Sequence, residues 1–592
     1  MSELVSQPTP ILSLYTMYRD GKLFVNRRYQ RKLVWTLEEK QMLIESILKK
    51  YPIPAIFIAE RENESGTYEI IDGLQRLHAI MSFIETAFTT KDGRLFNLNQ
   101  FPTAQTNADE GKFDSNITET SAVLNKTEVN IILDYTMALS VMRGATEEQV
   151  NDVFDRINTY GHRLSDQERR QAGVQSKFTD LVRQTACSMR GDTSEETLLL
   201  TDMPQVSVDL PLTKHGYGVL ADEVFWVRQG ILRSTDLRDS MDEQCIADIA
   251  SCIVGNKLIS RTKDALDKVY DKTSDEYKRV NNALDIYGVT KFQDEFKFCI
   301  DQLQAVASIG QREKIRDLVF NKKSTNAFPA LFTAIFIAFH ESLVQEKKVI
   351  HDYQGVKDAL RNLSSRIDTG RGAGSPEERR KNIRTIKGLI SDHLIKVKAI
   401  EGLYGCPSTV DIDEVIRRSE VELPNFELKQ GCLSLAPKGR KIDKNVFEKV
   451  INTICAMANN GKGRTGKILI GVADSDADAA LIERLDGISA IDVAKKKVVG
   501  VNREAEFLKI TVEQYVQKWK CAIEDSELSS HVKSSVLSSM DYHNYFGLGV
   551  IVITVPPQSE PCYVGDAMFW RSGDSTKPVA NLKLAAEIAQ RF

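Results

Sequence analysis

The stretch "EIIDGLQRLHAIMSFIETAF", residues 69–88, contains the junction on which the fold of the first part of the chain depends. The segment "TYEIID" (67–72) has the composition of a short strand. Apolar residues after the junction recur at the spacing of one helix face: Leu77, Ile80, Met81, Ile84 and Phe88. The residues between, Asp72-Gly73-Leu74-Gln75-Arg76, are therefore expected at a strand end and a helix N-terminus.

Such a junction is suited to binding an anion. Free backbone N–H groups and the positive end of the helix dipole meet there. Gly73 would allow a ligand to approach closely, Arg76 could hold a phosphate, and Asp72 could orient a water molecule or bind a metal. The alternative is a plain capped turn in which Asp72 and Arg76 pair with each other.

Composition narrows the class of protein. The 592 residues exceed one hydrophobic core, so two to four domains are expected. With 78 basic and 82 acidic residues the chain is no polycation, and nucleic acid would have to bind local basic patches.

Nine cysteines without a CxxC pair favour a reducing compartment over a disulfide framework or a structural zinc. We find neither a signal peptide nor a run of ~18 apolar residues, and we expect a cytoplasmic protein without membrane contact.

The pattern along the chain predicts a multidomain α+β protein. Residues 1–175 mix short strands such as "AIFIAE" (55–60) with helices that open on capping boxes, residues 176–400 are mostly helical, residues 401–420 form a linker, and residues 421–592 return to an α/β pattern. The three capping boxes are Thr36 with Glu39, Thr146 with Gln149, and Ser165 with Glu168. The last region should contain a helix at 443–458 and the strands "KILIGVA" and "VIVITV".

A glycine- and arginine-rich segment, "DTGRGAGSPEERRKN" (368–382), interrupts the helical middle. It is either a solvated loop or a loop that contacts phosphate, for which flexible backbone and guanidinium groups are suited.

Two further segments extend the N-terminal pattern. "VNRRYQRKLVW" (25–35) and "FDRINTYGHRLSDQE" (154–168), together with the Asp72–Arg76 turn, resemble the GmrSD-type N-terminal family. That family has glutamine where this chain has Leu74. The resemblance implies a ParB/sulfiredoxin-like fold, a turn that serves nucleotide binding and hydrolysis, and a role in restriction of foreign or modified DNA.

The same resemblance implies the residues of a nucleotide site. These are Tyr29, Gln30, Arg31, Asp72, Gly73, Gln75, Arg76 and Asn158. Trp35 is expected to pack in the core beneath them. Many family members carry a C-terminal HNH nuclease, but none of the eight histidines here lies in an HNH-like segment. We expect His340 and His393, in amphipathic helical stretches, to be satisfied by packing or solvent.

The C-terminal region contains a second group of chemical interest. "EVELPNFELKQG" supplies Glu422, Glu427 and Lys429, and Asp474 lies where the strand "KILIGVA" ends. Two glutamates and an aspartate near a lysine could bind a divalent metal through oxygen ligands and activate water. The alternative is that they are ordinary surface acids.

The segments "FELKQG", "VINTICAMANNGKGRTGKILIGVAD" and "VIVITVPPQSEPCYVGDAMFWRSGDST" resemble the Schlafen-type AlbA-like domain, with "KGRTGK" in place of the usual Gly-Gly. Some members of that family are metal-dependent endonucleases with a Glu/Glu/Asp triad, and others only bind nucleic acid. The resemblance implies Glu422, Glu427 and Asp474 as metal ligands. Seven basic residues are expected to form a local phosphate-binding surface: Lys438, Arg440, Lys441, Lys462, Arg464, Lys467 and Arg571.

Together these features predict a defence nuclease that binds GTP or ATP at one end and cleaves nucleic acid, DNA rather than RNA, with Mg²⁺ or Mn²⁺ at the other. One alternative is a module that senses nucleotide and nucleic acid while a partner performs the cleavage. Another is a nuclease of cellular RNA such as tRNA. The expected protein partners are a partner defence protein or further copies of the chain in a homo-oligomer.

Overall fold

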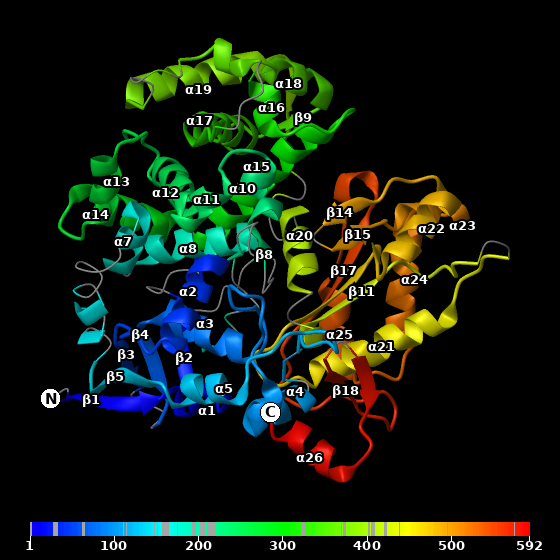
Figure 1. Cartoon of the computed structure of the whole chain (residues 1–592). Helices are drawn as coiled ribbons and strands as arrows, with labels where there is room; N and C mark the ends of the chain where they lie inside the picture. The colour runs from blue at the N-terminus through cyan, green and yellow to red at the C-terminus, as the bar shows by residue number, and fades with distance from the viewer. Residues whose placement is uncertain are drawn as a thin grey trace. The chain divides into compact units, whose positions relative to one another are not determined.

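The computed structural model describes residues 3–592 apart from 28–32, 62–65, 111, 114, 147–148, 151, 155, 157–164, 174–175, 192–196, 202, 204–207, 210–218, 321–325, 369, 371–373, 401–402, 404–408, 420–422, 437–438, 494 and 574. The chain divides into two compact units. The first comprises Met1–Phe292, Val319–Ile337 and Asn362–Ile386, and the second comprises Gln293–Leu318, Ala338–Arg361 and Lys387–Phe592. A mixed N-terminal sheet, a helical middle and a mixed C-terminal sheet confirm the predicted multidomain α+β class (Figure 1). The four-part division of the sequence stays a prediction.

The first unit is built on a six-stranded sheet in the order β1-β5-β3-β4-β2-β6. Its strands are β1 (Glu3–Pro10), β5 (Thr136–Arg143), β3 (Ile56–Glu60), β4 (Tyr68–Asp72), β2 (Leu23–Asn26) and β6 (Thr197–Leu199). Strands β3 and β4 pair antiparallel, whereas β2 runs parallel to β4 and β3 parallel to β5. The predicted strands at 55–60 and 67–72 are thus confirmed as β3 and β4.

Helices α1 (Ile11–Arg19), α2 (Leu37–Leu48), α3 (Leu74–Ile84) and α5 (Lys126–Asp134) contribute to one hydrophobic core with this sheet. The apolar stripe expected after the junction is buried there, although the helix ends at Ile84 and Phe88 follows it. The Thr36–Glu39 capping box is present at the start of α2, where the Thr36 amide donates to Glu39 at 2.7 Å. The Thr146–Gln149 and Ser165–Glu168 boxes are also formed.

The middle of the chain is helical, as predicted. Its longer helices are α8 (Lys177–Arg190), α12 (Met241–Val254), α14 (Asp275–Tyr287), α15 (Val289–Ser308), α17 (Pro329–Phe339) and α19 (Pro376–Ile390). Arg379 of α19 donates to the buried Asp248 of α12 at 2.8 Å. A π-helical turn over His340–Gln345 follows α17. His340 contacts Glu295 at 3.0 Å and His393 contacts Asp352 at 2.9 Å, so both histidines have protein partners, as expected.

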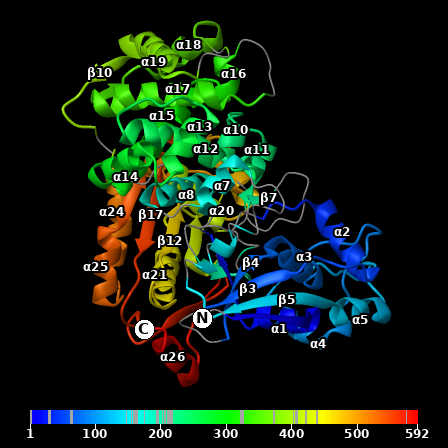
Figure 2. The same ribbon diagram turned by 90° about the vertical axis from the view of Figure 1, so that its left-hand side faces the viewer.

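The second unit contains a four-stranded sheet in the order β11-β12-β17-β16. Strand β11 (Phe426–Lys429) runs parallel to β12 (Gly466–Ile470), and β17 (Val550–Val555) pairs antiparallel with both β12 and β16 (Met540–His543). Helices α21 (Lys444–Ala458), α24 (Val512–Glu524) and α25 (Ser530–Ser538) lie beside these strands and share a core with them (Figure 2). The predicted helix at 443–458 and strand at 550–555 are confirmed.

The predicted strand "KILIGVA" is interrupted. Gly471 adopts φ +116°, a conformation that L-residues with side chains rarely adopt, and a Cβ there would lie 3.1 Å from the Gly549 carbonyl. The chain therefore leaves the first sheet after β12 and continues as β13 (Val472–Ala473) in a second sheet of order β13-β15-β14. The other members of that sheet are β15 (Lys496–Val498) and β14 (Ile491–Val493). Within the described part of the chain, none of the helices combines the length and apolarity needed to cross a bilayer.

Candidate functional sites

The first candidate site is the strand-to-helix junction. Strand β4 ends at Asp72, and Gly73 precedes helix α3 with φ +96°. A Cβ at this position would lie 2.5 Å from Cδ1 of Ile56, so glycine is required for space as well as for backbone conformation. The junction is therefore a strand end directly followed by a helix N-terminus, as predicted.

Asp72 and Arg76 form an ion pair across the turn. The Arg76 Nη2 donates to Asp72 Oδ2 at 2.7 Å and to the Ala55 carbonyl at 3.2 Å. The Asp72 side chain is 42% exposed, whereas that of Arg76 is 13% exposed. The pairing expected for a plain capped turn is thus present. A guanidinium carries five N–H donors, so a phosphate could be bound without breaking this pair.

Gln75 faces inward and connects α3 to the segment before α2. Its side chain is 8% exposed, and its Oε1 accepts hydrogen bonds from the backbone N–H groups of Val34 at 3.0 Å and Trp35 at 3.3 Å. Trp35 packs against the core of the unit, as predicted. Gln75 therefore fixes the chain just after the predicted nucleotide-binding segment. The other predicted ligands, Tyr29, Gln30, Arg31 and Asn158, lie outside the described residues.

Two buried polar residues near this turn were not predicted. Lys40 lies on the buried side of α2 together with Leu43, Ile44 and Ile47. Burial, with a further contribution from the Lys40 charge, holds the pKa of His78 on α3 well below its ordinary value of 6.5. The sequence did contain a signal, because Lys40 occupies the spacing of the apolar stripe.

The second candidate site lies in the C-terminal region, where two strands end side by side. Because β11 and β12 are parallel, their carboxyl ends meet at one edge of the sheet. Glu427 and Lys429 are two residues apart on β11, so their side chains lie on the same face of the strand. Asp474 directly follows β13. The Lys429 ammonium lies 2.5 Å from Glu427 Oε1 and 3.5 Å from Asp474 Oδ2. Three of the four predicted residues are thus brought together, and Glu422 lies outside the described residues.

Arg571 completes this cluster from a distant part of the sequence. It lies on β18 (Phe569–Ser572), is 5% exposed, and donates through Nη1 to Glu427 Oε2 at 2.8 Å. Its Nη2 also donates to the Phe426 carbonyl at 3.1 Å. Both carboxylate oxygens of Glu427 therefore contact a cation, one from Lys429 and one from Arg571.

The predicted basic surface needs correction at two positions. Arg571 is buried against Glu427, and Arg440 pairs with Asp486, because each guanidinium finds a carboxylate inside the fold. Lys441, Lys462 and Arg464 are exposed and Lys467 is half-buried. Lys438 lies outside the described residues. The surface available to phosphate is thus smaller than expected.

Lys429 is positively charged in this cluster. Burial disfavours the ammonium form, but the Glu427 and Asp474 carboxylates outweigh burial and raise the pKa of Lys429. The same desolvation raises the pKa of Asp474, an effect that Lys429 opposes and that the 54% exposure of the side chain limits. At neutral pH Lys429 is therefore a cation that can contact an anion, and it is not a general base.

The cluster has donors of the kind that a hard divalent cation prefers. Glu427 and Asp474 offer carboxylate oxygens. The Lys429 ammonium is within 3.5 Å of both, so it competes with a metal for the same two carboxylates. Among the described residues, no three His, Cys, Asp or Glu side chains form a group that could hold a metal ion.

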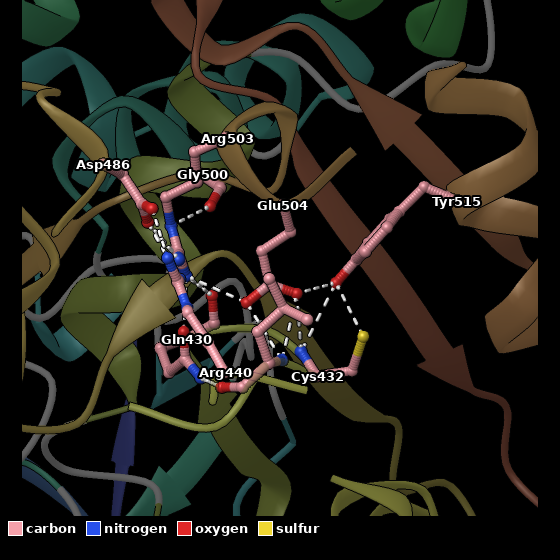
Figure 3. A network of polar contacts seen from close by, with 9 residues as sticks. Gln430, Cys432, Arg440, Asp486, Gly500, Arg503, Glu504 and Tyr515 are labelled. Atoms are coloured by element: carbon pink, nitrogen blue, oxygen red, sulfur yellow. Dashed lines mark hydrogen bonds and ion pairs between the residues drawn. The ribbon is translucent and has the colours of Figure 1, made fainter. Parts of the chain in front are cut away.

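A buried network forms around the loop that follows β11 (Figure 3). Glu504 is fully buried and accepts hydrogen bonds from the Cys432 N–H at 2.8 Å, the Leu433 N–H at 3.2 Å and the Tyr515 hydroxyl at 2.5 Å. Gly431 makes this possible, since a Cβ there would lie 2.1 Å from Glu504 Oε1. The network fixes the loop that follows Lys429.

A second part of the same network joins this loop to helix α22 (Asp476–Asp486). Arg503 donates to Asp486 Oδ2 at 2.7 Å and to the Gln430 carbonyl at 2.8 Å, and Arg440 donates to Asp486 Oδ2 at 3.0 Å (Figure 3). Glu504 and Arg503 were not predicted, because charged residues in a short helix carry no sequence signal for burial.

Two family models match parts of the chain. Residues 11–174 match the GmrSD restriction endonuclease, N-terminal domain, and residues 427–580 match the family described as Schlafen, AlbA_2. No curated protein matches the chain. The chain therefore contains a GmrSD N-terminal domain followed by a Schlafen AlbA_2 domain, and both predicted resemblances are confirmed. The second match begins at Glu427, five residues after Glu422.

Proposed function

We propose that the protein is an antiphage defence enzyme that binds and hydrolyses a nucleoside triphosphate at its N-terminal domain and cleaves nucleic acid at its C-terminal domain. A GmrSD-type domain indicates restriction or defence, and an AlbA_2 domain indicates nucleotide or nucleic-acid binding. The observation that carries the proposal is the meeting of Glu427, Lys429 and Asp474 at the edge where β11 and β12 end.

At the N-terminal domain, GTP or ATP would bind at the junction before α3. Arg76 and the N–H groups of the first helical turn would contact phosphate, with Gly73 allowing close approach. Asp72, whose carboxylate is 42% exposed, would orient the attacking water. Gln75 would act indirectly, through its hydrogen bonds to the backbone of Val34 and Trp35. Tyr29, Gln30, Arg31 and Asn158 complete the proposed ligand set.

At the C-terminal domain, each residue has a distinct proposed task. Glu427 and Asp474, with Glu422, would hold Mg²⁺ or Mn²⁺. Such an ion, when bound, polarises a phosphoryl oxygen and lowers the pKa of coordinated water. The Lys429 ammonium would move from between the carboxylates to the substrate phosphate, where its charge stabilises the negative charge that develops during cleavage. Arg571 would keep Glu427 in place.

One observation favours a second candidate. Both oxygens of Glu427 contact cations, Lys429 and Arg571, which compete with a metal ion for this carboxylate. The arrangement therefore also suits a module that binds nucleic acid without cleaving it. In that case the protein senses nucleotide and nucleic acid, and a partner defence protein cuts.

The experiment that tests the proposal incubates the purified full chain with plasmid DNA, modified phage DNA and tRNA. Each substrate is tested with Mg²⁺ or Mn²⁺, with and without GTP or ATP. The proposal predicts metal-dependent cleavage, with modified or foreign DNA preferred, and phosphate release from the nucleotide. Cleavage of tRNA alone would identify the protein as an RNA nuclease. Binding of nucleic acid without cleavage under every condition would contradict the proposal and favour the sensing module.

A further inference from the structure

The C-terminal domain contains a lysine-rich hairpin that the proposed function does not use. Strands β14 and β15 form this hairpin, and its run Lys495-Lys496-Lys497 was not among the residues predicted to bind phosphate. Strand β15 also pairs antiparallel with β13, the strand that Asp474 directly follows. The hairpin therefore lies beside one of the proposed metal ligands.

The register of the β13–β15 pair places Lys496 opposite Asp474. Val472 pairs with Val498 and Ala473 pairs with Lys497, so the same register continues to Asp474 and Lys496. Side chains that are directly opposite in antiparallel strands lie on one face, with Cβ atoms about 4.5–5.5 Å apart. The Lys496 Nζ donates to the Asp474 carbonyl at 3.3 Å, in agreement with this register.

The two lysines of β15 differ in what their charges contact. Lys497 pairs with Asp492 of β14 at 2.6 Å, so its charge is compensated within the hairpin. Lys496 is half-buried and donates to a neutral carbonyl, and within the described part of the chain it forms no direct ion pair with a carboxylate. An ammonium has three N–H donors, so donors remain for a ligand. Of the two lysines, Lys496 is therefore the one that can bind an anion.

The basic residues that were predicted from the sequence lie elsewhere. Lys467 pairs with Phe426, the residue before Glu427, so the side chains of Lys467 and Glu427 lie on opposite faces of the sheet. Lys462 and Arg464 lie in the turn that precedes β12, whereas the proposed ligand that follows β13 lies beyond the other end of that strand. The five residues of β12 alone span roughly 16 Å. The predicted turn is thus distant from the carboxylate that Lys496 adjoins.

We propose that Lys496 binds a phosphate of the nucleic-acid backbone, so that the bound strand passes over β13 and β15 and not over the turn at 462–464. This assignment rests on the proposed binding of nucleic acid by the C-terminal domain and adds the path of the substrate. A phosphate beside Asp474 is within reach of Lys496 and of Lys429, which both contact Asp474. Their charges offset the repulsion between the phosphate and the carboxylates. Such contacts carry no sequence information, so Lys496 binds the phosphodiester backbone of any sequence.

The salt dependence of binding, measured by fluorescence anisotropy, tests the proposal. The full chain is titrated into a fluorescein-labelled DNA duplex and, in parallel, a labelled tRNA, between about 50 and 200 mM KCl. EDTA prevents metal-dependent cleavage, so the measurement is valid whether the domain cleaves or only binds. For duplex DNA the logarithm of the association constant falls by about 0.9 per phosphate contact for each tenfold rise in salt. Lys496→Gln should lower this slope by about one contact and weaken binding about 8-fold at ~0.1 M KCl, equally for unrelated sequences.

The matched control is Lys497→Gln, which removes the same charge from the neighbouring residue but from an ammonium that already pairs with Asp492. It should keep the wild-type slope. Lys462→Gln tests the competing path over the predicted turn, and the proposal expects the larger change in Lys496→Gln. Far-ultraviolet circular dichroism checks that each variant is folded.

The outcomes separate this proposal from the proposed function. A wild-type slope in Lys496→Gln, or equal changes in Lys496→Gln and Lys497→Gln, would overturn the assignment while binding by the domain still stands. A slope lowered by Lys462→Gln and not by Lys496→Gln would place the strand on the turn and would also overturn it. If the wild-type chain binds neither nucleic acid, the proposed function fails together with the assignment.

Discussion

The two candidate sites differ in how far apart in sequence their paired charged residues lie. The Asp72–Arg76 pair joins residues four apart in sequence, across one turn, and its carboxylate is 42% exposed. The Glu427–Lys429–Asp474–Arg571 cluster joins three distant segments, and the Arg571 and Glu427 side chains are only 1% and 15% exposed. The first site is formed by residues that are neighbours in sequence, whereas the second is assembled by the fold.

This difference separates function from stability. An ion pair with an exposed carboxylate contributes little to folding, so Asp72 and Arg76 can be changed with little effect on the fold. A buried ion pair whose partner is removed leaves an uncompensated charge, so the C-terminal cluster should be sensitive. The predictions below, from the largest effect to the smallest, test this contrast.

The largest effect is expected at Arg571. Arg571→Met should destabilise the C-terminal sheet by about 1.5–3 kcal/mol, because Glu427 Oε2 and the Phe426 carbonyl lose their donor while Lys429 remains beside Glu427. Hydrogen exchange of the β11 and β12 amides measures this local stability. The exposed Arg464→Met in the same domain should change stability by no more than about 0.5 kcal/mol. Similar protection in both variants would show that the buried pair does not matter.

Asp72→Ala is expected to act on catalysis. It should lower nucleotide hydrolysis at least ~100-fold, as for loss of a group that orients the attacking water, with the melting temperature nearly unchanged. Phosphate release by the full chain is the measurement. Asp20→Ala, which removes an exposed carboxylate of the same unit, should retain full activity. If Asp72→Ala hydrolyses nucleotide at the wild-type rate, the turn is only structural.

The two regions should also differ in their response to acid. Burial and the Lys40 charge lower the pKa of His78 in the folded N-terminal unit. Below pH 6.5 the unfolded unit therefore binds a proton at His78 that the folded unit does not bind, and the free energy of unfolding falls as the pH drops. Burial alone would raise the pKa of Asp486, but Arg440 and Arg503 lower it below 3.8, so its contribution is present above 3.8 and lost as pH falls further. Each group gives a slope of at most about 1.4 kcal/mol per pH unit.

Hydrogen exchange at a series of pH values can follow both units in one sample. Amides of α3 should lose protection between about pH 6.5 and pH 5, while those of α22 should lose it only below about pH 4. His78→Leu should flatten the first dependence and Asp486→Asn the second. Coincident transitions in both units would contradict this assignment of the titrating groups.

The smallest effect is expected for Arg76→Met as a change in stability. Its ion pair has an exposed partner, so the loss should be no more than about 1 kcal/mol in urea unfolding, although nucleotide binding should weaken. Arg19→Met in the same unit is the contrast, since Arg19 pairs with the buried Glu85 and should cost more. A loss for Arg76→Met as large as that for Arg19→Met would show that the turn belongs to the structural core.

The features that could be predicted from the sequence are those whose residues are neighbours along the chain, and the features that were missed depend on the tertiary fold. The turn at Asp72–Arg76, the capping boxes and helix α21 were predicted because their determinants are neighbours in sequence. The break at Gly471 was missed, because an apolar run through glycine is typical of an uninterrupted strand. Arg571 was assigned to the surface since arginine is rarely buried, and only the tertiary fold brings Glu427 to it.

The central claim is that Glu427 and Asp474 together hold the metal ion with which the C-terminal domain would cleave nucleic acid. Single-turnover cleavage and binding of the same labelled substrate are measured for wild type, Glu427→Gln, Asp474→Asn, the double variant and the exposed control Asp476→Asn. Each single change should lower the cleavage rate at least ~100-fold while binding is retained. The double variant should lose little more, because one missing ligand already disables the site. Wild-type cleavage by the double variant would contradict the account.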